Sequence, residues 1–183
     1  MRTIAAISVV ALFALALSAC GGDSLDSQTA SQAMSEAMGA GTTAYSKVAA
    51  EMGKIDGAWV SGSADSFQVS GEVTGLHGGS ATVSGSGSKA TLTAFKMDLS
   101  MTFKDWKSAQ GLVLNGTINL SYDVKNVAPT INYTMKYSGD LEVSGSASGT
   151  ASFDLTISMS GPGGYKVCGT VSDHDVSAPP GSC

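Results

Sequence analysis

The chain has 183 residues, enough for one ordinary domain with short appendages. Ten Lys and Arg residues stand against 15 acidic residues, which gives a formal net charge of −5. This balance argues against binding to nucleic acid, and against docking onto anionic lipid by charge alone, because both need clustered Lys and Arg side chains.

The first twenty residues have the organisation of a signal peptide. Arg2 provides a short cationic start, and residues 4–17 are apolar apart from Ser8. A stretch of this length suits the core of a signal peptide, whereas a membrane-spanning helix needs about 20 apolar residues. We therefore predict a signal peptide over residues 1–19.

The segment ends in Leu17-Ser18-Ala19-Cys20, which resembles the lipobox of bacterial lipoprotein precursors. The resemblance covers residues 1–20 only. It implies a diacylglyceryl group on the sulfur of Cys20, cleavage before Cys20, and acylation of the new amino group, palmitate being a typical acyl chain. Two or three acyl chains anchor a protein stably, whereas one binds membranes only marginally. The alternative is a plain secretory signal with a chance cysteine.

The same resemblance bears on location. In enterobacteria an aspartate directly after the lipidated cysteine retains the lipoprotein in the inner membrane, and here Gly21 stands in that place. The expected location is therefore the cell envelope, anchored by lipid in the outer membrane. The membrane itself is the partner that the lipid on Cys20 implies, and a protein partner is not identified.

After the cysteine, small polar residues over 20–29 predict a flexible lipidated tether. Residues 30–52 then carry Ala, Met, Tyr and Val at spacings of three and four, which predicts an amphipathic helix. Gly39 and Gly41 fall in its middle, and each costs about 1 kcal/mol relative to Ala. A break or kink near 39–43 is therefore expected.

From about residue 57 the apolar period changes from 3.6 to 2, which is typical of strands with one buried face. The clearest alternations begin at Phe67, Phe95, Leu112, Ile131, Ala151 and Tyr165. Short turn-rich links join them, residues 84–88 among those links, and short links imply antiparallel neighbours. We count seven strands, or eight if residues 57–61 also pair.

Asn115-Gly116 is a strong hairpin signal. A turn there would place the buried face of one arm against the wet face of the other. Reading straight through instead keeps residues 112–124 in phase, and a slip of one residue inverts a whole strand. We therefore predict one continuous strand, with a gap at Gly116 that the ring of Tyr133 or Tyr137 fills.

The predicted fold is mainly β: a curved antiparallel meander of seven to eight strands, with the helix against its apolar face, in one domain over residues 30–172. A closed up-and-down barrel and a sandwich are the alternatives, because all three hide one apolar face. In outline the open sheet resembles lipid-carrier and lipoprotein half-barrels, although no motif of theirs is present. Residues 173–183 read as a C-terminal tail.

Two cysteines remain once Cys20 carries lipid. Cys168 points to the wet face of its strand by parity, and the tail that ends in Cys183 can turn back to it. In an oxidising envelope this predicts a disulfide between Cys168 and Cys183, the alternative being two free thiols.

Sites for chemistry are weak in this sequence. In Asp173-His174-Asp175, neighbouring side chains on an extended chain point in opposite directions, so a solvated turn is a better interpretation than a metal site. Residues 85–88 read as a hairpin or flexible loop, because a phosphate-binding loop would need a following helix and a Lys. No nucleophile stands in a catalytic setting. We expect no catalysis, no metal and no cofactor.

Six large side chains share the apolar face and could line a site for lipid or another apolar small molecule. They are Phe95, Tyr122, Tyr133, Met135, Tyr137 and Phe153. The first functional hypothesis is therefore a non-catalytic envelope lipoprotein that binds such a ligand. The second is a structural or surface-interaction lipoprotein with a packed core, which uses its Ser/Thr-rich sheet face for contacts. The third is a small outer-membrane β-barrel.

Overall fold

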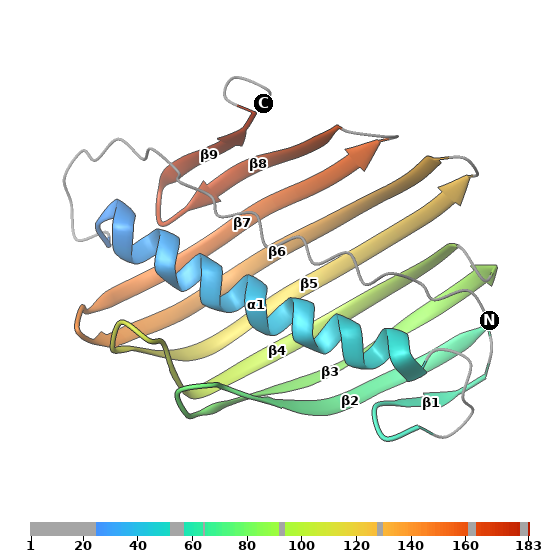
Figure 1. Ribbon diagram of the computed structural model, residues 1–183, viewed down its shortest axis with the longest axis horizontal. Coiled ribbons are helices and arrows are strands. Elements are labelled where there is room, and N and C mark those ends of the chain that lie inside the picture. The colour runs from blue at the N-terminus through green and yellow to red at the C-terminus, as the bar shows by residue number, and fades with distance from the viewer. Residues whose placement is uncertain are drawn as a thin grey trace.

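The computed structural model describes residues 25–51, 57–63, 65–91, 94–127, 130–160, 164–179 and 183. The predicted signal peptide, Cys20 and residues 21–24 of the predicted tether lie outside these residues. The described chain forms one antiparallel sheet with one helix, α1, lying across one of its faces (Figure 1). The prediction of an antiparallel meander with a helix on its apolar face is confirmed. The sheet is not closed, so the barrel and sandwich alternatives are wrong.

The strands follow one another across the sheet in chain order, so that β1 and β9 form its two edges. Their bounds are β1 (Val60–Gly62), β2 (Ser66–Thr74), β3 (Ser80–Thr91), β4 (Ala94–Lys107), β5 (Leu112–Val127), β6 (Thr130–Gly145), β7 (Gly149–Ser160), β8 (Tyr165–Val171) and β9 (His174–Ala178). β1 corresponds to the eighth strand, which we predicted on the condition that residues 57–61 pair with the sheet. β9 was not predicted, because it belongs to a segment that reads as a tail.

Helix α1 (Ser27–Glu51) begins three residues earlier than predicted. Asp26 is its N-cap residue, since its Oδ1 accepts hydrogen bonds from the backbone amides of Gln28 and Thr29 at 3.0 and 2.9 Å. The hydrogen bond from the Thr29 amide does most to hold the pKa of Asp26 below its ordinary value. Residues 27–29 therefore belong to the helix and not to the tether.

The helix is continuous through Gly39 and Gly41, so the predicted break near 39–43 is wrong. Gly41 is buried against the sheet, and a Cβ placed there would lie 2.8 Å from Cδ2 of Leu120 and 3.4 Å from the hydroxyl of Tyr137. A Cβ on Gly39 would meet nothing within 4 Å. Gly41 thus allows the helix axis to come close to β5 and β6, and this contact offsets the poor helix propensity of glycine.

Strand β5 passes straight through Asn115-Gly116, as the phase of its apolar residues predicted. Gly116 has a φ of 129°, which a residue with a side chain adopts only with strain. It stands opposite Leu141 of β6, whose Cδ2 lies 3.4 Å from the position of the missing Cβ. The prediction that Tyr133 or Tyr137 fills this gap is therefore wrong, because Leu141 covers it.

Residues 84–88 are the middle of strand β3 and not a connection. They pair with β2 on one side and with β4 on the other. The ring of Phe67 occupies the space that a side chain at Gly87 would need. The apolar bulk at this place comes from the neighbouring strand, so the alternation that identifies a strand is missing from the local sequence.

Candidate functional site: the two faces of the sheet

The inner face of the sheet is covered by α1. Most of the helix residues buried against the sheet are small, and Ala30, Ala33, Ala37, Ala40 and Ala44 are at most 1% exposed. Small side chains let the helix lie close to the large residues of the strands, and the two sets form one continuous hydrophobic core. Figure 1 shows the helix crossing the strands diagonally over most of the width of the sheet.

The six residues predicted to line an apolar-ligand site all belong to this core or pack against it. Tyr122, Tyr137 and Phe153 are buried, at 3 to 5% exposure. The other three, Phe95, Tyr133 and Met135, are only partly buried. The structure therefore brings the six predicted residues to one face. Three of them are enclosed by other side chains of the protein, which leaves no room there for a ligand to contact them without displacing those side chains.

A residue that the sequence did not single out, Tyr45 of α1, joins this group. Its ring stacks on Tyr122 of β5 at 5.4 Å between centroids and on Phe95 of β4 at 6.2 Å. The hydroxyl of Tyr122 donates to the carbonyl oxygen of Gly41 at 3.5 Å. Burial raises the pKa of Tyr122 well above its ordinary value, and burial raises that of Tyr137 as well. Both phenols are therefore neutral at physiological pH and suit a closed core.

Polar contacts hold the helix at further points. Glu51, at its C-terminal end, accepts hydrogen bonds from the backbone amides of Trp59 and Val60 at 2.6 and 3.2 Å. In its middle, Glu36 accepts a hydrogen bond from Nε1 of Trp106 at 2.9 Å. These contacts tie α1 to the start of β1 and to the end of β4.

Trp106 reaches the inner face through a bulge in β4. The pairing of β4 with β5 shifts register between Phe103 and Trp106, and Asp105 between them has a φ of 48°. The extra residue changes the side on which the following side chains stand, so Trp106 is buried and packs edge-on against Phe103 with centroids 5.5 Å apart. Strand β4 continues beyond this bulge to Lys107.

The outer face of the sheet is polar and carries a shallow groove. The groove has a volume of about 400 Å³, opens to solvent, and crosses strands β3 to β6. Its lining residues are Ser84, Gly85, Asp98, Leu99, Ser100, Asn119, Leu120, Ser121, Lys136 and Ser138. Half of them are serine or asparagine residues on paired strands, and these short side chains, together with Gly85, leave the depression. The alternation of the strands predicts this Ser/Thr-rich face but no groove on it.

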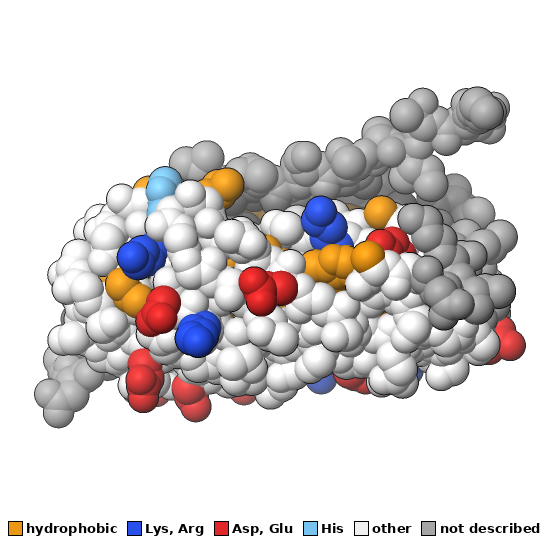
Figure 2. Space-filling view, turned by 90° about the horizontal axis from the view of Figure 1, so that it is seen from below, with side chains coloured by type: hydrophobic (Ala, Val, Ile, Leu, Met, Phe, Trp, Pro, Cys, Tyr) orange, Lys and Arg blue, Asp and Glu red, His pale blue; other side chains and the backbone are white. Residues whose placement is uncertain are grey.

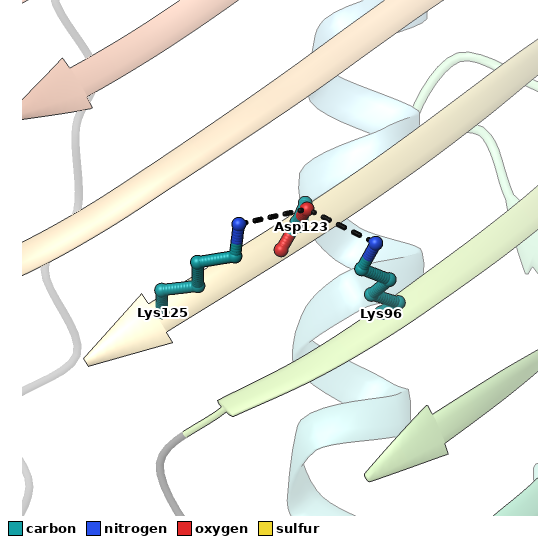
Figure 3. Close-up of polar contacts among 3 residues, drawn as sticks. All are labelled: Lys96, Asp123 and Lys125. Atoms are coloured by element: carbon teal, nitrogen blue, oxygen red, sulfur yellow. Dashed lines mark ion pairs between the residues drawn. The ribbon is translucent and has the colours of Figure 1, made fainter. Parts of the chain in front are cut away.

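The charged groups of the outer face are few and partly paired. Figure 3 shows Asp123 of β5 between two lysines, with Lys96 Nζ at 3.4 Å and Lys125 Nζ at 3.7 Å from its Oδ2. The lysine side chains are two-thirds exposed, so these ion pairs contribute little to stability. Viewed from the β1 edge in Figure 2, the described surface is mostly uncharged, with Lys and acidic side chains scattered over it.

The segment Asp173-His174-Asp175 does not form one cluster. His174 is buried, and its Nε2 lies 3.1 Å from the carbonyl oxygen of Leu25, next to the start of α1. Asp173 and Asp175 are exposed. The interpretation as a solvated turn holds for Asp173, which has a φ of 64°, whereas His174 begins β9. In the described part of the chain, no group of three His, Cys, Asp or Glu side chains is arranged to hold a metal ion.

The predicted disulfide is present between Cys168 and Cys183, whose Cα atoms lie 5.7 Å apart. Cys168 stands on the outer face of β8, opposite Ser177 of β9. The bridge therefore holds the end of the chain against the last strand pair of the sheet.

Cys20, the predicted site of lipid attachment, lies outside the described residues. Among the helical residues that the structure does describe, none belongs to a helix long and apolar enough to cross a bilayer. The chain matches no known protein family, no curated protein and no solved structure.

Proposed function

We propose that this chain is a non-catalytic lipoprotein of the cell envelope, anchored in the outer membrane through lipid on Cys20, which binds a polar partner with the outer face of its sheet. The observation that carries the proposal is the difference between the two faces of the sheet, one covered and one exposed. Its own helix covers the inner face, while the groove of about 400 Å³ lies on the outer face over β3 to β6.

The chemistry of the groove suits a polar and weakly charged partner. Serine hydroxyls and the amide of Asn119 can each donate and accept hydrogen bonds, so they match hydroxyl and amide groups on a partner. Asp98 and Lys136 line the same groove from β4 and β6 and offer one charge of each sign. A strongly acidic or strongly basic partner would find no complementary field here.

Binding of a lipid or other apolar molecule at the inner face is the alternative. The partly buried side chains of Phe95, Tyr133 and Met135 favour it, because they leave apolar surface beside α1. A ligand there would have to contact these three residues, or displace α1 from Tyr122 and Tyr137.

The anchor is tested by expressing the full chain and its Cys20→Ser variant with an alkyne-bearing fatty acid. The proposal predicts label on the wild-type protein and its recovery with outer membranes. The variant should be unlabelled and recovered without detergent. Wild-type protein that stays unlabelled would contradict the anchor.

The groove is tested by photo-cross-linking in intact cells. A photoreactive residue replaces Ser121 inside the groove or, as a matched control, Ser152, an exposed serine of β7 outside the groove. The proposal predicts a discrete adduct from position 121 and none from position 152. Equal labelling from both positions, or none from 121, would contradict a binding role for the groove.

A further inference from the structure

We propose that the row of turns at the end of the sheet where α1 begins faces the membrane, with the side chain of Leu76 in contact with the lipid. This proposal rests on the lipid anchor at Cys20. The turn row consists of residues 75–79, 108–111, 146–148 and 172–173, which join β2 to β3, β4 to β5, β6 to β7 and β8 to β9. All four lie at the same end of the molecule as the start of α1, at the left of Figure 1.

The distance from the lipid to the folded domain is short. Leu25 is buried, at 4% exposure, and Asp26 caps the helix, so only residues 21–24 separate Cys20 from the folded chain. Five peptide steps from Cys20 to Leu25 reach at most about 18 Å, even fully extended. The sixteen residues of β6, by comparison, span about 50 Å. The tether therefore holds this end of the sheet close to the bilayer.

Leu25 is fixed to the turn row itself. Its carbonyl oxygen lies 3.1 Å from Nε2 of His174, directly after the last turn. Its side chain covers Gly149, directly after the third turn, where a Cβ would lie 2.8 Å from Cδ2 of Leu25. The point at which the tether enters the domain is thus part of the same surface as the turns.

Hydrogen bonds link the turns and their strand ends laterally. The Ser146 amide donates to the carbonyl oxygen of Gly111 at 3.1 Å, and the Lys107 amide donates to that of Gly78 at 3.0 Å. Within the first turn, the Gly75 amide donates to Gly79 at 3.0 Å. The row therefore presents one connected edge to the membrane.

The turns of this edge carry few charged side chains compared with the outer face of the sheet. Within the four turns Asp173 is the one carboxylate, and Lys and Arg are absent from them. The outer face, in contrast, exposes Asp98, Asp140 and Asp154 in the middle of the sheet. An anionic bilayer repels those carboxylates, and this orientation keeps them away from the lipid.

The exposure of Leu76 identifies it as the residue that contacts the lipid. Leu76 is 97% exposed at the tip of the first turn, whereas the buried leucines of the chain lie in the core. An exposed leucine gains from leaving water, and the headgroup boundary of the bilayer is the apolar surface that the short tether brings near it. Full insertion of the domain is not required for this contact.

The test uses the full lipidated chain in vesicles of phosphatidylethanolamine and phosphatidylglycerol. A nitroxide is attached to one introduced cysteine at a time: Leu76→Cys and Ser148→Cys in the turn row, or Ser160→Cys, an exposed site at the opposite end of β7. Paramagnetic resonance then compares accessibility to oxygen, which enters the bilayer, with accessibility to a nickel chelate, which stays in water. Native Cys168 and Cys183 remain in their disulfide.

We expect the ratio of oxygen to nickel accessibility to rise several-fold at Leu76, and also at Ser148, on incorporation into vesicles, and to stay unchanged at Ser160. An unchanged ratio at Leu76, or an equal rise at Ser160, overturns the orientation. Flotation with the vesicles is measured on the same samples. Protein that fails to float refutes the lipid anchor, whereas protein that floats without a signal at Leu76 refutes only the orientation.

Discussion

Replacing Gly41 with Ala measures how closely α1 lies on the sheet. The new methyl group would stand 2.8 Å from Cδ2 of Leu120 and 3.4 Å from the hydroxyl of Tyr137, both of which are buried. Because both side chains belong to the core, the helix must shift or the surrounding side chains must repack to admit the methyl group. Overpacking of this kind costs about 1–3 kcal/mol.

Gly39→Ala is the matched control, because it makes the same chemical change two residues away in the same helix. A Cβ at Gly39 meets nothing within 4 Å, so only the helix propensity changes there, by about 1 kcal/mol in favour of the folded state. The propensity gain is common to both variants. Their free energies of unfolding should therefore differ by about 1–3 kcal/mol, with Gly39→Ala the more stable.

The assay is urea unfolding of a soluble form that begins at Gly21, followed by circular dichroism and extrapolated linearly to water. An unchanged slope with a shifted midpoint would mean that stability alone has changed. If Gly41→Ala stabilises the protein as much as Gly39→Ala does, then α1 does not pack closely on β5 and β6, and the description of the inner face is wrong.

Three further variants test other contacts of the fold. Glu51→Gln removes the negative charge that accepts the amides of Trp59 and Val60, and we expect a loss of about 1 kcal/mol in urea unfolding; an unchanged midpoint would show that this contact does not hold the helix end. Asp26→Ala should cost about 1 kcal/mol at pH 7. Because the pKa of Asp26 is lowered in the folded state, its contribution to stability is complete above the ordinary value of 3.8 and is lost as the pH falls through the lowered value. The free energies of unfolding of wild type and variant should therefore converge in acid. A constant difference between them at all pH values would contradict the capping role. Cys183→Ser opens a bridge between residues 15 apart and should cost about 3 kcal/mol, and reduced wild type should match the variant.

Much of the sheet could be predicted from the sequence, because strands with one buried face leave a period of two. The continuity of β5 through Gly116 followed from phase alone. Strand β3 is not recognisable at residues 84–88, since Gly85 and Gly87 stand at its inward positions and the bulk that covers Gly87 belongs to Phe67 of β2. The alternation of apolar and polar residues within one strand cannot reveal that a side chain of a neighbouring strand covers its glycines.

The candidate site was less accessible to sequence reasoning. The inner-face residues were placed correctly by parity, but the stacking of Tyr45 on Tyr122 depends on how the helix is positioned along the strands, which periodicity does not specify. Trp106 was missed because the bulge at Asp105 reverses the parity behind it. The groove depends on cross-strand register, which brings Ser84, Ser100 and Asn119 side by side from three strands.

The start of the domain illustrates a local signal that was overlooked. Asp26 is followed three residues later by Thr29, and both bond at the helix terminus. Asp is among the residues that favour the N-cap position, so this start could have been read from the sequence. The buried Leu25 could not, because its partners His174 and Gly149 are distant in the chain.

The most direct test of the account is mass spectrometry of an organic extract from the purified soluble form, produced in a bacterial periplasm. The extract shows whether α1 alone fills the apolar face of the sheet, which would leave the outer face for binding. We predict folded, monodisperse protein whose extract contains no stoichiometric lipid. A lipid present at one molecule per chain would contradict the claim and would place the binding site at the inner face beside Phe95, Tyr133 and Met135.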